Sequence, residues 1–291
     1  MKTMLVTLTL VAATAASAAA AAAAIEPARD VAALLKAVDR YRTGGAIDNL
    51  QVETQVTVFN RDGTPDKERR YTVFAQARHK SLVLMRSPAE AGQKVLMLGD
   101  DFWLLLPGSQ RPLRITPAQK LLGDAAIGDI ATLSWAEDYT GTLVGEERCA
   151  PAGAVAAAAP TAPTAPAAPA APTAPTASAP SAAAPTSVPC LHLTLQSARK
   201  GLSYARIELW LGARKHEPLL AELYVQSEKL AKRASFVMDR AAAPTRVDEM
   251  VLSDRLGAHK ETRVRYLSRQ PKQVPEAWLN PMFLARNPAL E

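Results

Sequence analysis

The sequence contains few of the residues that metal sites and redox chemistry need. Among 291 residues there are two cysteines and four histidines, and aromatic residues make up 5%. The histidines are far apart, and none lies at metal-ligand spacing from another histidine or a cysteine. They are His79, His192, His216 and His259. We therefore predict no metal site and no cofactor, and we interpret these histidines as structural or surface residues.

Motifs for nucleophilic or phosphate chemistry are absent as well. Residues 107–111 read PGSQR, which lacks the second glycine of a G-x-S-x-G nucleophile motif and falls in an expected hairpin turn. No glycine-rich phosphate loop is present. Four acidic residues are explained more simply as caps and turn residues than as catalytic carboxylates. They are Asp124, Asp129, Glu137 and Asp138. The sequence predicts that the protein is not an enzyme.

The only long apolar run is N-terminal, where residues 1–24 have the layout of a secretory signal peptide. Lys2 provides the positive start, and the apolar core ends in alanines, so we expect cleavage between Ala19 and Ala24. A retained membrane anchor is the alternative, but the Leu/Val-rich part is too short to span a bilayer. No cysteine lies near the cleavage region, which excludes lipid attachment there. We expect the mature protein to be exported without a lipid anchor.

Charge of one sign is not concentrated in any part of the chain. The formal net charge is +6, and removal of Lys2 leaves +5. Lysines and arginines are spread along the chain with acids between them, which is typical of a solvated surface. A membrane surface or an anionic partner is the alternative. Because the protein is expected to be exported, we predict no nucleic-acid partner.

Charged residues are missing from residues 150–189, which are almost wholly Ala, Pro, Thr and Ser. Prolines recur at every third residue from Pro160 to Pro175, which matches a polyproline II helix. Such a segment has nothing with which to build a core. We predict a disordered insert, and a Pro-rich partner-binding motif is the alternative.

The two cysteines, Cys149 and Cys190, flank this insert. In an exported protein two thiols favour a disulfide over a reactive pair or a metal site. The bond would bring their Cα atoms to about 5.5 Å and tie off the insert at its base. We therefore predict one domain over residues 25–291, interrupted by the insert at 150–189. Two domains on a flexible tether are the alternative.

The rest of the chain predicts one helix followed by a long antiparallel meander. Residues 27–41 place apolar side chains at helical spacing, with Pro27 suited to the first turn and two glycines after Thr43 ending the helix. From residue 50 onward, about ten or eleven short segments alternate apolar and polar residues between turn signals. Residues 117–133 and 275–288 break the alternation. A sheet of this length must curl to bury one face, so the fold class is mainly β with a few helices.

Residues 102–106, FWLLL, are five consecutive apolar residues. The run is too short to cross a bilayer as a helix or as a membrane strand. On a strand, its even-numbered residues point to one face and its odd-numbered residues to the other, so both faces must be covered. The sequence leaves open which of the two sets would face a ligand, and packing within the core alone is the alternative.

One block of the sequence resembles a known family. It comprises residues 92–143, which read GQKVLMLGDDFWLLLPGSQRPLRITPAQKLLGDAAIGDIATLSWAEDYTGTL, together with YARIELWL at 204–211 and PEAWLNPMFL at 275–284. These segments resemble the outer-membrane lipoprotein-sorting group of the LolA/LolB-like superfamily. The resemblance implies an unclosed antiparallel β-barrel of about eleven strands with a helical lid over an apolar cavity. The insert departs from the family pattern.

The same resemblance implies which residues line the cavity. Residues 27–41 and 117–133 would form the lid. The lid residues expected to face the cavity are Leu34, Leu35, Val38, Leu121 and Leu122. The expected wall residues are Val56, Val58, Val73, Leu84, Trp103 and Leu105.

The resemblance also implies a function without chemistry. It indicates a periplasmic carrier that takes lipid or lipoprotein acyl chains and moves them toward the outer membrane. Its partners would be an inner-membrane exporter or an outer-membrane acceptor. The alternative is a periplasmic binding module that does not transport, such as an envelope-stress sensor or an accessory subunit of an inner-membrane export system.

Overall fold

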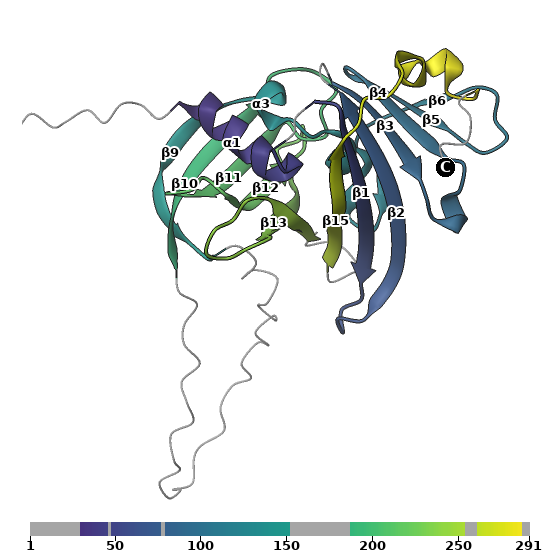
Figure 1. The fold of residues 1–291 in the computed structure, drawn as a ribbon. Coiled ribbons are helices and arrows are strands. Elements are labelled where there is room, and N and C mark those ends of the chain that lie inside the picture. The colour runs from purple at the N-terminus through teal and green to yellow at the C-terminus, as the bar shows by residue number, and fades with distance from the viewer. Residues whose placement is uncertain (1–29, 46–47, 77–78, 152–186, 254–260, 287–291) are drawn as a thin grey trace, which may run out of the picture.

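The computed structural model of the protein describes residues 30–45, 48–76, 79–151, 187–253 and 261–286. The expected signal peptide and most of the Ala/Pro insert lie outside the described residues. The described segments form one strongly curled antiparallel sheet with short helices on its concave side (Figure 1).

Helix α1 (Val31–Thr43) begins four residues later than the sequence predicted and ends two residues later. Its N-cap is Asp30, whose carboxylate accepts a hydrogen bond from the backbone N–H of Ala32 at 2.9 Å. Gly44 ends the helix in the left-handed conformation, with φ of 73°. A capping side chain therefore fixes the start, whereas Pro27 lies outside the described residues.

Thirteen of the strands in the described residues form a single sheet, in the order β6-β5-β4-β3-β2-β1-β15-β14-β13-β12-β11-β10-β9. All neighbouring strands are antiparallel. Their bounds are β1 (Leu50–Phe59), β2 (Pro65–Gln76), β3 (Lys80–Met85), β4 (Lys94–Leu98), β5 (Asp101–Leu105), β6 (Leu113–Ile115), β9 (Tyr139–Cys149), β10 (Val188–Ser197), β11 (Arg206–Gly212), β12 (Pro218–Tyr224), β13 (Leu230–Met238), β14 (Val247–Ser253) and β15 (Glu261–Pro271). The predicted fold class is confirmed, although the strands outnumber the expected eleven.

The sheet is unclosed, because β6 and β9 stand at opposite ends of the strand order. The loops near the two ends are nevertheless joined by an ionic contact. Arg199, in the β10–β11 loop, bonds Asp138 before β9 at 2.7 Å and also pairs with Asp100 in the β4–β5 turn. His79, which precedes β3, lies 3.2 Å from Asp138. Charged side chains therefore link the ends where backbone pairing does not.

The segment expected to form a helical part of the lid, residues 117–133, is helical only in its second half. It starts with a hairpin of β7 (Lys120–Leu122) and β8 (Ala125–Ala126), followed by α2 (Ile127–Ala131). Gly123 makes the hairpin turn at φ of 56°, packed so closely on Val58 that a Cβ there would lie 2.6 Å from that side chain. A third short helix, α3 (Trp135–Asp138), leads into β9.

Three 3₁₀ turns complete the described elements. Turn η1 (Pro88–Glu90) joins β3 to β4. Turns η3 (Glu276–Leu279) and η4 (Pro281–Phe283) follow β15 and lie beside β3 to β6, on the side away from α1 (Figure 1). The second segment that broke the strand pattern is therefore a cover for the outer face of the sheet.

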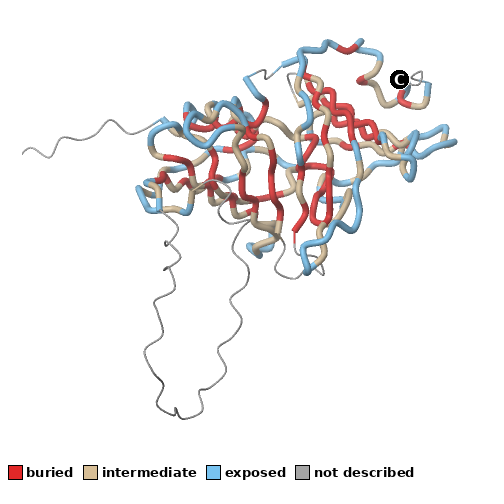
Figure 2. The backbone as a smooth tube through the Cα atoms, turned by 60° about the horizontal axis from the view of Figure 1, so that its bottom comes forward, coloured by how far each residue is buried: buried red, intermediate tan, exposed pale blue. Residues whose placement is uncertain are grey.

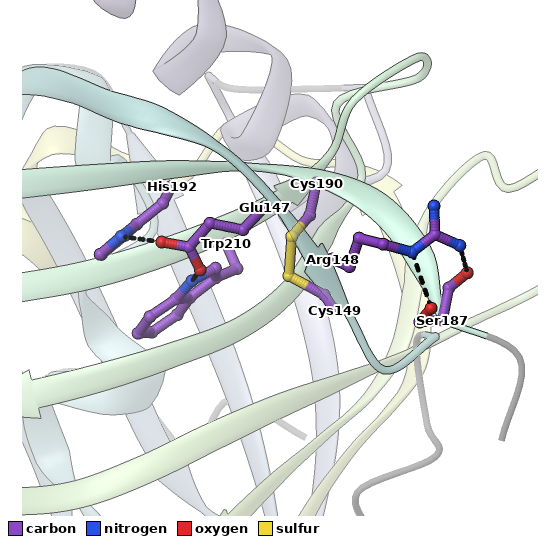
Figure 3. Close-up of a disulfide and its surroundings, with 7 residues drawn as sticks. All are labelled: Glu147, Arg148, Cys149, Ser187, Cys190, His192 and Trp210. Atoms are coloured by element: carbon purple, nitrogen blue, oxygen red, sulfur yellow. Dashed lines mark hydrogen bonds and ion pairs between the residues drawn. A yellow bond between two sulfur atoms is a disulfide. The ribbon is translucent and has the colours of Figure 1, made fainter. Parts of the chain in front are cut away.

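The predicted disulfide between Cys149 and Cys190 is confirmed, with a Cα–Cα distance of 5.9 Å (Figure 3). It joins β9 to β10, so the chain on both sides of the insert belongs to one sheet. Closing a loop of this length stabilises the folded state by about 4 kcal/mol in the chain-entropy model. Strand β10 starts at Val188, two residues inside the predicted insert, because Val188 and Pro189 pair with the end of β9.

Candidate functional site

The sheet carries an apolar cluster on each of its two faces. The inner cluster lies on the concave face and includes residues of α1, α2 and strands from both halves of the sheet. The outer cluster lies under the C-terminal 3₁₀ turns. In β5, Phe102 belongs to the inner cluster, and Leu104 packs against that cluster. Leu105 belongs to the outer cluster, and Trp103 packs against it. The prediction that both faces of this strand are covered is confirmed. Buried residues concentrate along the strands of the sheet, and many exposed residues lie in the turns at its edges (Figure 2).

Eight of the predicted cavity residues lie on the inner side. Five are members of the inner cluster and two more pack against it. These seven are Leu34, Leu35, Val38, Val56, Val73, Leu121 and Leu122. The eighth, Val58, is buried beneath Gly123 at the turn of the β7–β8 hairpin.

The structure does not bring the other three to this face. Leu84, Trp103 and Leu105 contact the outer cluster, on the opposite side of the sheet. The reason is strand alternation, because residues one position apart point to opposite faces. Of their inner-face neighbours, Val83 was missed, whereas Phe102 belongs to the set that the sequence left open as the alternative. The β2–β3 register, which pairs Val73 with Val83, is the signal that could have identified Val83.

A lid covers the inner cluster. We use this name for α1 together with residues 117–138, which comprise the β7–β8 hairpin, α2 and α3. Leu35 and Val38 of α1 and Ile130 of α2 are almost fully buried against the sheet. Trp135 of α3 packs edge-on against Phe236 of β13, with ring centroids 6.3 Å apart. The lid therefore buries apolar side chains of its own on the concave face.

Asp39 and Arg42 bind the parts of the lid to one another. The Asp39 carboxylate accepts hydrogen bonds from the backbone N–H groups of Trp135 and Ala136, both at 2.8 Å, and from the Ser134 hydroxyl at 3.0 Å. The Arg42 guanidinium donates to the carbonyls of residues 132 and 133. Burial raises the pKa of Asp39, while Arg42 and the hydrogen bonds oppose the shift. The lid is thus a single hydrogen-bonded body.

A second polar group fastens the lid to the sheet. Asp129 of α2 lies 2.9 Å from the ammonium of Lys232 in β13 and accepts a hydrogen bond of 2.6 Å from the Tyr204 hydroxyl. Lys232 also donates to the backbone carbonyl of Asp124 at 2.6 Å. Burial, and then the charge of Asp129, raise the pKa of Tyr204. A buried ion pair contributes little net stability because both charges lose their water.

The space under the lid is nearly filled. Between Arg42, Trp135, Tyr139 and Met250 a cavity of only about 30 Å³ remains, close to the volume of one water molecule. A larger cavity of about 310 Å³ opens beside the β7–β8 hairpin, next to Tyr204 and Lys232. The structure therefore has the lid closed over the inner face.

Among the described residues, no group of three or more His, Cys, Asp or Glu side chains could hold a metal ion. No helix in the described part of the chain is long and apolar enough to cross a membrane. What the site offers is apolar surface and a cover that polar contacts hold in place.

Comparisons with other proteins agree with this geometry. A family model described as "Uncharacterized protein" matches residues 77–162. None of the curated proteins matches the sequence. Among solved structures, a LolA superfamily protein from Nitrosomonas europaea has 22% identity and a TM-score of 0.65, covering 85% of this chain and 96% of its own.

Two further structures are similar. A putative outer membrane lipoprotein-sorting protein domain from Vibrio parahaemolyticus has 14% identity and a TM-score of 0.59, covering 88% of this chain and 98% of its own. A DUF1329 family protein from Desulfovibrio piger has 17% identity and a TM-score of 0.58, covering 85% and 96%. The chain therefore has the fold of LolA superfamily and lipoprotein-sorting proteins, as its sequence predicted.

Proposed function

We propose that the protein is a periplasmic carrier that binds the acyl chains of a lipid or lipoprotein on its inner face. The supporting observation is the inner cluster, which continues from α1 and α2 across both halves of the sheet under a lid with buried polar contacts. The disulfide indicates an oxidising compartment, which agrees with the periplasm.

Physical chemistry supports reversible binding at such a face. Each CH₂ group removed from water contributes about 0.8 kcal/mol, so fifteen CH₂ groups contribute about 12 kcal/mol before costs are subtracted. Opening the lid loses the apolar contacts of α1 and α2, which an acyl chain can replace. Water can then hydrate Asp129 and Lys232, which offsets part of the free-energy cost of separating this ion pair. Binding and release need no covalent step.

In this proposal the carrier receives its cargo from an inner-membrane exporter and hands it to an outer-membrane acceptor. The test is extraction of the mature protein, purified from the cell envelope, followed by mass spectrometry of the organic phase. We expect acyl lipids or acylated peptide in the extract. An empty extract, together with no binding of the fluorescent fatty acid cis-parinaric acid, would rule out the carrier. Co-purification of a protein partner under those conditions would favour the non-transporting binding module.

A further inference from the structure

A sizeable cavity lies outside the lid. It is a groove of about 610 Å³ at the rim where β10 and β12 begin and β11 and β13 end. No residue of the lid lines it. We call it the rim groove. Its volume falls within the range of about 300–1,000 Å³ typical of small-molecule sites.

One wall of the rim groove is apolar. Leu219, Val237 and Met238 line it together with Ala213 and Pro244. Met238 and Ala213 also pack against the inner cluster, so the wall adjoins the apolar interior of the sheet. A chain of CH₂ groups lying there would exchange water for hydrocarbon contacts.

The lining of the rim groove also contains two cations, Arg214 and Lys215. Arg214 is exposed and has no hydrogen-bond or ion-pair partner among the described residues. The Lys215 ammonium donates a hydrogen bond to the backbone carbonyl of Ala242. The backbone carbonyl of Lys215 accepts a hydrogen bond of 2.9 Å from the Tyr41 hydroxyl, and these two bonds fix the turn between β11 and β12. Glu217 is the only acid in the lining, so two cations and one carboxylate leave a formal charge of +1. The Glu217 carboxylate lies against Gly212.

From this juxtaposition we propose that the rim groove binds an acyl chain that ends in an anionic group, either a carboxylate or a phosphate. The chain lies along Leu219, Val237 and Met238, and the anionic group pairs with Arg214. Arginine suits this role because its guanidinium presents paired donors to carboxylate or phosphate oxygens. The site is available while the lid is shut, so it is separate from the proposed inner-face site.

A lid held shut by a disulfide separates the two sites experimentally. A Cβ added to Gly128 in α2 would lie against the Ser203 hydroxyl oxygen in the β10–β11 loop and 3.2 Å from Pro117. Cysteines at positions 128 and 203 are therefore close enough to bond once the adjoining loop shifts slightly. The Ser203 hydroxyl has no hydrogen-bond partner in the described part of the structure, so its loss removes none there. The variant Gly128→Cys with Ser203→Cys, in its oxidised form, is the locked protein.

The experiment titrates locked protein with cis-parinaric acid and with its uncharged methyl ester, following probe fluorescence. We expect the acid to bind about tenfold more tightly than the ester. Arg214→Glu should abolish that preference, while Arg111→Glu, an exposed cation in the β5–β6 loop, should leave it intact. Met238→Trp should fill the groove and weaken both probes at least tenfold. Because Arg214 is exposed, its variant remains informative even if Met238→Trp does not fold.

Lysophosphatidic acid and oleic acid, used as competitors, show whether phosphate or carboxylate is preferred. Equal affinity for acid and ester, or an acid preference that survives Arg214→Glu, would overturn the proposal. If locked protein binds no probe and unlocked protein does, the rim groove fails and the carrier remains. If both forms bind the same number of probe molecules, the inner-face site fails and the rim groove remains.

Discussion

The two faces of the sheet are both covered, but their covers are built differently. The outer cover is the segment after β15, where Val274, Leu279 and Leu284 are buried in the outer cluster. Trp278 packs edge-on against Phe74, with ring centroids 5.8 Å apart. The inner cover is the lid, which has buried carboxylates at positions 39 and 129 in addition to its apolar contacts.

This difference explains how the cover of the outer face can stay in place while the lid on the inner face can open. Lifting the outer cover would expose apolar side chains to water, which is unfavourable. Packing within the protein alone explains why these side chains are buried. Lifting the lid also exposes apolar side chains, but it separates an ion pair and hydrogen bonds as well, and water can replace these polar contacts. In the proposed function, a bound acyl chain covers the exposed apolar surface. We therefore interpret the outer face as structural and the inner face as the exchangeable one. Variants at three positions, with controls at two more, test whether the two covers differ in this way.

The largest effect is expected from Asp39→Ala. It leaves Arg42 buried without its partner and removes the acceptor of two α3 N–H groups, so the free energy of unfolding should fall by about 3–5 kcal/mol. Ser134→Ala is the control, because it keeps the Asp39 carboxylate and removes one hydrogen bond to it together with the N-cap bond from the Glu137 N–H, which should cost about 1–2 kcal/mol. Urea denaturation measures both. Equal losses would show that Asp39 does not hold the lid together.

Leu279→Ala probes the outer cover. The side chain is 4% exposed, so its truncation should lower the free energy of unfolding by about 2–4 kcal/mol. Affinity for cis-parinaric acid, measured well below the unfolding transition, should not change. A loss of probe affinity without unfolding would mean that the outer face takes part in binding.

Tyr204→Phe loosens the lid without changing its shape. Loss of the hydrogen bond to the Asp129 carboxylate should cost about 1.5–3 kcal/mol. Because the cost falls on the closed lid, the fraction of protein with an open lid should rise, and the apparent affinity for the probe should increase roughly ten- to hundredfold. Tyr224→Phe is the matched control, since its hydroxyl donates to Glu222 away from the lid. If Tyr204→Phe left probe affinity at the wild-type value, this contact would not govern the lid.

The smallest effect is a pH dependence at Asp39. Its folded-state pKa is raised by burial above the ordinary value of 3.8, so the folded state binds the proton more tightly than the unfolded chain does. Stability from this group is therefore fully present below pH 3.8 and is lost as pH rises through the folded pKa. In urea denaturation at a series of pH values, the stability of wild type relative to Asp39→Asn should fall as pH rises from 4 toward 7. An increase over that range would contradict a raised pKa.

Much of the fold follows from the sequence by simple rules. Alternation in segments such as YARIELWL predicted antiparallel strands, and the positions of Cys149 and Cys190 predicted the disulfide. The strand count was too low partly because β7 and β8 have three and two residues, too few for a period-two pattern. The hairpin before α2 depends on Gly123 fitting against Val58 and Thr262, which are distant in sequence.

The candidate site was less predictable than the fold. In β3 and β5 both faces are buried, so apolar residues occupy successive positions and alternation no longer identifies the inner face. Leu84, Trp103 and Leu105 were assigned to the cavity for this reason. Asp129 bonds Tyr204 and Lys232, which lie 75 and 103 positions away in the sequence, and no local motif could reveal contacts of that range.

The central claim is that the lid controls access to the inner face. The most direct measurement is the number of cis-parinaric acid molecules bound per protein in the locked variant, before and after reduction, with wild type plus reductant as the control for the native disulfide. The account predicts that the oxidised lock binds only at the rim groove and that reduction restores the additional, lid-dependent binding. The same number bound in both forms would contradict it.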